Sequence, residues 1–140
     1  MRRDERGLAV SVEAAVLIPV LLLFVALVVT AARVAIAEQH VGAAASAAVR
    51  AASLERTTAS AQAAGERAAG ASLAEHGTTC RSTALRLDST GVGRGLGERA
   101  VVTAEVTCVV DLADVSLPLV PGTHTVAAQR TSPVDPLRGK

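Results

Sequence analysis

The residues that could do chemistry in this 140-residue chain are few and widely spaced. The three histidines, His40, His76 and His124, have no cysteine or carboxylate partner at a spacing typical of metal ligands. His76 and Cys80 could supply two ligands, but a structural zinc needs four. No serine lies in a Gly-x-Ser-x-Gly turn. We therefore predict no catalytic residue, no metal site, no cofactor and no small-molecule substrate, and we expect the protein not to be an enzyme.

The chain has two cysteines, Cys80 and Cys108, which are candidates for a disulfide bond. An even cysteine count favours a disulfide in a protein that lies outside the cytoplasm. Closing a loop of about 29 residues would add roughly 3–4 kcal/mol in the chain-entropy model. The alternative is two free thiols, with Cys108 as a small core residue.

Neither a phosphate-binding loop nor a nucleic-acid interface is supported. The glycine-rich run at residues 91–97 lacks a Gly-Lys-Ser/Thr ending, and the pattern after it predicts a strand instead of a helix. We interpret it as a hairpin loop. The net charge is +1 and aromatic residues make up 1% of the chain. Nucleic-acid binding would need a basic patch or a stacking platform, and we predict neither.

An apolar segment at residues 8–32 is the strongest pattern in the chain. Its polar or helix-breaking interruptions are Ser11, Glu13, Pro19 and Thr30. As a helix, 25 residues span roughly 37 Å, which suits a tilted crossing of a hydrocarbon core of about 30 Å. We predict a single transmembrane helix.

Arginines set the predicted orientation of that helix. Arg2, Arg3 and Arg6 directly precede the apolar segment, whereas Arg33 alone lies close behind it. The positive-inside bias places the N-terminus in the cytoplasm and the rest of the chain outside.

A cleaved secretory signal is the alternative interpretation of the same segment. Ala35-Ile36-Ala37 would be the small-residue cleavage site, with Glu38 as the new first residue. The 16-residue apolar run is slightly long for a signal core, and a signal peptide has no use for the charge of Glu13. We therefore favour the retained helix.

Glu13 and Pro19 are the informative residues inside the apolar segment. A carboxylate in the hydrocarbon costs roughly 2.5 kcal/mol or more if it is deep and unpaired, and such residues are functional candidates by default. The alternative is a shallow Glu13 that reaches the interface. Pro19 removes one helix hydrogen bond, which predicts a kink.

Beyond residue 32 the chain is rich in alanine, the best helix former. We predict that the first helix continues to about Leu54 and that a second runs from about Thr57 to Glu75, with Gly77 as its stop. Small residues at helical spacing predict a packing face, and they are Val34, Val41, Ala45, Ala48 and Ala52.

Alternating residues after Gly77 predict three strands, at Ser82–Ser89, Ala100–Leu112 and Thr123–Thr131. Inward positions are Thr83, Leu85, Leu87, Val102, Ala104, Val106, Cys108, Val110, Val126 and Ala128. The sequence therefore predicts an α+β fold, with a long helix laid across an antiparallel meander. We divide the chain into a cytoplasmic leader (1–7), a transmembrane helix (8–32), an extracytoplasmic helical region (33–76) and a small β domain with a C-terminal tail (77–140).

The start of the chain carries the run Arg6-Gly7-Leu8-Ala9-Val10-Ser11-Val12-Glu13-Ala14-Ala15-Val16-Leu17-Ile18-Pro19. With this run, the first 35 residues resemble the start of TadE-like proteins, pseudopilin-like components of tight-adherence (Tad) pilus systems. A weaker likeness to actinobacterial members lies in Ser132-Pro133-Val134-Asp135-Pro136-Leu137-Arg138.

The resemblance implies a pilin-like architecture and a minor pilin or pseudopilin-like role in pilus assembly or secretion. It implies that a prepilin peptidase cuts between Gly7 and Leu8, and that Glu13 pairs with the N-terminal amine of a neighbouring subunit. The implied partners are the membrane, other pilin-like subunits and the Tad assembly platform. In type IV pilins this Glu is the fifth residue after the cut, whereas Glu13 is the sixth after Gly7. The alternative functions are a small disulfide-bonded protein secreted by cleavage after Ala37 and, with least support, a membrane-anchored enzyme.

Overall fold

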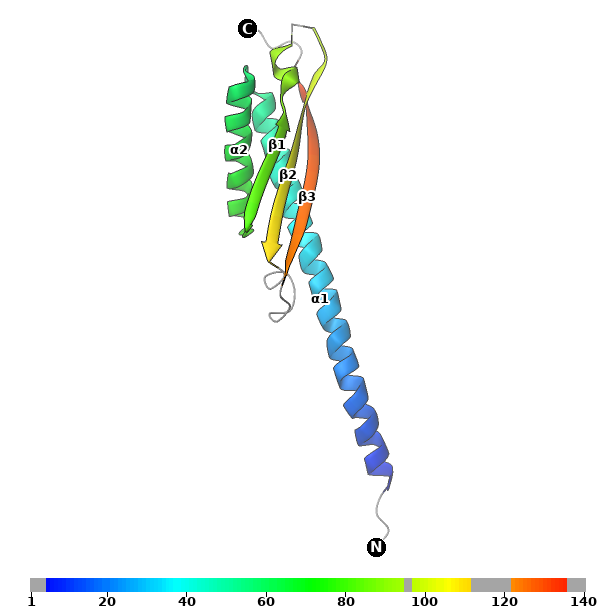
Figure 1. The fold of residues 1–140 in the computed structure, drawn as a ribbon. Helices are drawn as coiled ribbons and strands as arrows, with labels where there is room; N and C mark the ends of the chain where they lie inside the picture. Colours follow the sequence, from blue (N-terminus) through cyan, green and yellow to red (C-terminus); the bar gives the residue numbers. More distant parts are fainter. Residues whose placement is uncertain (1–4, 95–96, 112–121, 136–140) are drawn as a thin grey trace.

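The computed structural model describes the backbone of residues 5–94, 97–111 and 122–135, and the side chains from residue 14 onward within those ranges. The elements are helix α1, helix α2, strand β1, the short 3-10 helix η1 and strands β2 and β3 (Figure 1). Residues 1–4 of the predicted leader and the end of the C-terminal tail lie outside the described residues.

Helix α1 covers Glu5–Ser53, 49 residues in one continuous element. At a rise of 1.5 Å per residue it is about 74 Å long, and Figure 1 shows one half of it projecting away from the remaining elements. Its end at Ser53 confirms the predicted continuation of the first helix to about Leu54. The helix also runs through Pro19, and the predicted kink there stays a prediction.

Helix α2, Thr58–Glu75, folds back along the distal half of α1 (Figure 1). Thr57 caps its first turn because the Thr57 hydroxyl accepts from the Ser60 N–H at 3.1 Å, while the Ser60 hydroxyl accepts from the Thr57 N–H at 3.4 Å. Gly77, at φ +63°, follows its C-terminal end. Both ends agree with the prediction.

The sheet is an antiparallel meander in the order β1–β2–β3. Its strands are β1 (Ser82–Asp88), β2 (Ala100–Asp111) and β3 (Thr123–Val134), with η1 (Thr90–Gly93) between the first two. Leu85 lies opposite Val106, and Cys108 lies opposite Val126. The predicted α+β architecture is therefore confirmed, and β3 extends three residues beyond the predicted end.

The core lies where α1 and α2 pack against one face of the sheet. Its predicted helix stripe is confirmed from Val41 to Ala52, whereas Val34 is only half-buried. The inward residues of β2 are all buried, while Thr83 at the start of β1 is exposed. Among the residues that the structure describes, the largest fully buried side chains are Val41, Val102, Val106 and Cys108. Small side chains let the helix approach the sheet closely, but they bury little area each.

Candidate functional site: the exposed half of helix α1 and its junction with the head

The N-terminal half of α1 exposes a continuous apolar surface. We call residues 14–36 the shaft and the described residues from Ala37 onward the head. Leu23 is 69% exposed and Phe24 is 61% exposed. The other large apolar side chains exposed there are Val16, Leu17, Ile18, Val20, Leu21, Leu22, Val25, Leu27, Val28, Val29 and Ile36. Soluble monomers rarely expose apolar patches beyond a few hundred Å², so this surface requires a covering of lipid or of other apolar helices.

Within the described residues, α1 is the one helix long and apolar enough to cross a membrane. From residue 14 onward, the first buried residue of α1 is Ala37, which marks where the shaft enters the head. The long N-terminal apolar helix indicates single-pass membrane anchoring.

Two polar features of the shaft differ in how they are satisfied. The Thr30 hydroxyl donates to the Ala26 carbonyl at 2.8 Å, one turn back along the helix, so it needs no partner in an apolar surrounding. Pro19 has no N–H, and the Ala15 carbonyl therefore lacks its usual donor four residues later. Such a carbonyl in an apolar shaft is a place where a neighbouring polar group would be favoured.

The backbone of α1 includes the predicted site residues Gly7, Leu8 and Glu13, but the structure does not describe their side chains. Helical rise places Glu13 about 36 Å along the axis from Ala37, where the head begins. Position 13 of the helix is therefore well separated from the head.

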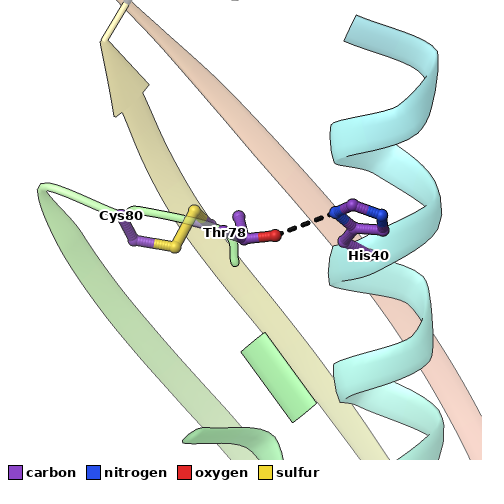
Figure 2. Close-up of a disulfide and its surroundings, with 4 residues drawn as sticks. His40, Thr78 and Cys80 are labelled. Carbon is purple, nitrogen blue, oxygen red and sulfur yellow. Dashed lines mark hydrogen bonds between the residues drawn. A yellow bond between two sulfur atoms is a disulfide. The ribbon is translucent and has the colours of Figure 1, made fainter. Parts of the chain in front are cut away.

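The disulfide joins Cys80, shortly after α2, to Cys108 in the second half of β2, with Cα atoms 5.5 Å apart. This is the pairing that the even cysteine count predicted. Cys108 is fully buried and Cys80 is half-buried. The bond ties the segment that follows α2 to the central strand, and Figure 2 shows it beside Thr78 and His40.

A histidine pair lies at the junction of shaft and head. The rings of His40 on α1 and His76 after α2 have centroids 4.7 Å apart and planes tilted by 42°. His40 Nδ1 lies 2.9 Å from the Thr78 hydroxyl (Figure 2), and His76 Nδ1 donates to the Ser72 carbonyl at 2.7 Å. Both rings line a cavity of about 270 Å³ that also contacts Arg33.

Sequence reasoning treated the three histidines as scattered, and the structure corrects this for two of them. The α1–α2 hairpin brings His40 and His76 together, whereas His124 lies exposed at the start of β3. The short connection between the two predicted helices could have indicated this contact. It implies a helical hairpin, and both histidines lie in that hairpin on the side away from the turn. Among the described residues, no group of three or more His, Cys, Asp or Glu side chains could hold a metal ion.

Comparison with known proteins locates the similarity in α1. The family model described as TadE-like protein matches residues 9–50. This range contains Glu13, Pro19, the whole shaft and most of the part of α1 that packs in the head. The resemblance to TadE-like proteins is thus confirmed over these residues. A search of curated proteins found no match, and a search of solved structures found none.

Proposed function

We propose, from the TadE-like match over residues 9–50, that this chain is a membrane-anchored minor pilin or pseudopilin-like subunit of a Tad-type pilus assembly or secretion system. The observation that carries the proposal is an exposed apolar shaft continuous with a helix that packs into a small α+β head. A shaft of this kind can be held in a membrane and can later pack among the shafts of other subunits. The role is structural and non-catalytic.

In this proposal the N-terminus is cytoplasmic and the head lies outside. Three arginines before the apolar segment, against Arg33 close behind it, support that orientation. The disulfide supports it independently, because such bonds persist in oxidising compartments.

Glu13 is proposed to act in assembly. A prepilin peptidase would cut between Gly7 and Leu8, and the carboxylate of Glu13 would pair with the new N-terminal amine of a neighbouring subunit. Opposite charges attract strongly in a low-dielectric surrounding. Because no equivalent charge pair would form elsewhere along the shaft, this pair would fix the axial register between neighbouring subunits. The partners are other pilin-like subunits and the Tad assembly platform.

The test compares Glu13→Gln and Glu13→Ala with wild type in cells that build the pilus. Glu38→Gln is the matched control, because Glu38 is an exposed carboxylate on the same helix just beyond the shaft. We expect unchanged membrane levels for all variants, since removing a charge does not hinder insertion. Cross-linked and sheared pilus fractions should lose the two Glu13 variants and keep Glu38→Gln. Equal incorporation of all variants would contradict the assembly role.

A further inference from the structure

A groove of about 570 Å³ lies between helix α2 and strand β1. Glu66, Gly70 and Leu73 line it from α2, and Thr83 and Leu85 line it from β1. Among the described residues, none from β2 or β3 contributes to the lining. The groove is therefore at the outer edge of the sheet, where a further strand beside β1 would rest on α2 (Figure 1).

The backbone of β1 offers a row of hydrogen-bond donors and acceptors at this edge. β1 is a seven-residue outer strand that pairs with β2 on one side. In such a strand, the N–H and C=O groups of every second residue point away from the paired strand. An extended peptide is the occupant whose own backbone matches this alternation at strand spacing.

The opposite edge of the sheet, strand β3, is protected against such pairing. A proline in a sheet places its nitrogen on the free edge, so Pro133 removes one donor from the edge of β3. The Gln129 carbonyl, four residues earlier, faces the same way and accepts from Arg130 Nη1 at 2.8 Å. Arg130 also lies opposite the buried Ala104, which makes it an inward-facing charge. Prolines and inward-facing charges both block the pairing of edge strands.

Strand β1 has neither kind of protection. Its sequence contains no proline, and its inward-facing side chains are those of Thr83, Leu85 and Leu87. The sheet therefore has one blocked edge and one open edge, and the groove lies at the open one.

The side chains of the groove indicate which peptide would fit it. Leu73 is buried and Leu85 is half-buried, so apolar side chains of an added strand would pack on them. Among the described residues of the lining, Glu66 alone is charged, and it is exposed. Its Oε1 accepts from Gln62 Nε2 at 2.7 Å, and a carboxylate has room for further donors. A basic side chain in the occupant would complement it.

We infer that the β1 edge binds an extended segment of another protein, which adds to the sheet as a fourth strand. The segment has apolar side chains at every second position and one basic side chain opposite Glu66. This docking surface belongs to the head alone, so the inference is independent of the pilus role and of membrane anchoring.

The experiment uses the full chain in nanodiscs and a labelled synthetic peptide that alternates valine with threonine and carries lysine in place of one valine. Fluorescence anisotropy should show binding to wild type. Hydrogen exchange should slow at alternate amides of β1 and stay unchanged in β3. N-methylation of one alternate set of peptide amides should abolish binding, because that set faces β1, while N-methylation of the other set should preserve it.

Variants in the groove test its two walls. A Cβ at Gly70 meets nothing within 4 Å, so Gly70→Leu should fill the groove without disturbing the head and lower the affinity about tenfold. Ala71→Leu, on the same helix but outside the lining, is the matched control and should bind as wild type does. Glu66→Gln should lower the affinity by up to about fivefold. Glu66→Lys should prefer the same peptide with glutamate in place of its lysine.

Three results would overturn the inference. The first is absence of binding to wild type, or equal binding of the two N-methylated peptides. The second is equal affinity of Gly70→Leu and wild type. The third is slowed exchange of the same β1 amides without peptide, increasing with protein concentration, because it would assign the edge to a second copy of the chain.

Discussion

At the scale of single residues, Asp88 organises the turn that follows β1. Its Oδ1 accepts from the Thr90 hydroxyl at 2.8 Å and from the Thr90 N–H at 3.1 Å. Both bonds stabilise the carboxylate and hold the pKa of Asp88 below its ordinary value, and the bond from the Thr90 hydroxyl contributes more than the bond from the backbone N–H. Because the folded-state pKa is lowered, the interaction stabilises the head above the unfolded pKa of about 3.9 and is lost as pH falls through the folded pKa.

Thr90→Val tests this assignment with little change of shape. We expect the pKa of Asp88 to rise toward its ordinary value, although the bond from the backbone N–H remains. NMR of the Asp88 carboxyl carbon, followed from about pH 2 to pH 6 around that ordinary value, measures the shift. Thr125→Val, an exposed threonine on β3, is the control. An Asp88 pKa that Thr90→Val leaves unchanged would refute the role of the hydroxyl.

The disulfide between Cys80 and Cys108 is the second feature of individual residues that stabilises the head. The largest fully buried side chains of the described residues are three valines and Cys108, so the core is thin and the covalent link matters. We expect Cys80→Ala with Cys108→Ala to lower the free energy of unfolding of the head by about 3–4 kcal/mol. Chemical denaturation of the detergent-solubilised chain measures this. Reductant should lower the stability of wild type similarly and leave the double variant unaffected; insensitivity of wild type would count against the bridge.

At the scale of elements, η1 packs so closely against β2 that it requires a glycine at position 91. A Cβ at Gly91 would come within 2.6 Å of the Val101 carbonyl oxygen, whereas a Cβ at Gly93 meets nothing within 4 Å. Gly91 is buried and Gly93 is exposed in the same short helix. The loop between β1 and β2 therefore packs its first half against the sheet.

Gly91→Ala and Gly93→Ala form a matched pair for that packing. Overpacking of this kind typically costs about 1–3 kcal/mol, so Gly91→Ala should lower the unfolding temperature of the head. Gly93→Ala should leave it unchanged or raise it slightly, because alanine restricts the unfolded chain. Thermal unfolding followed by circular dichroism compares the two, and an equal effect would show that Gly91 is not closely packed.

The ends of helices and strands could be predicted from the sequence where nearby residues determine them. The Thr57 cap and Gly77 mark the two ends of α2, and the alternation of residues 100–111 marks β2. The end of β3 was predicted at Thr131 but lies at Val134, because the last three residues pair with the start of β2 and Val101 lies opposite Pro133. Proline is tolerated on an edge strand, so Pro133 does not end this one.

At the scale of the whole molecule, the sequence predicted the long helix, the meander and the cysteine pairing but missed the junction cavity. The His40–His76 contact depends on how far α2 runs back along α1, a tertiary relation that no local pattern carries. The family match to TadE-like proteins covers the shaft and most of the part of α1 packed in the head. The head beyond residue 50 was therefore interpreted mainly from helix propensity, residue alternation and glycine positions.

The proposed function requires that the shaft stays attached to the head and anchors it in a membrane. The most direct test is the N-terminal sequence and intact mass of the mature protein recovered from its own cells. We predict membrane-associated protein that begins at Leu8, after processing, or at Met1, without it, so that the shaft is retained in either form. Soluble protein that begins at Glu38, cut after Ala37, would contradict the account.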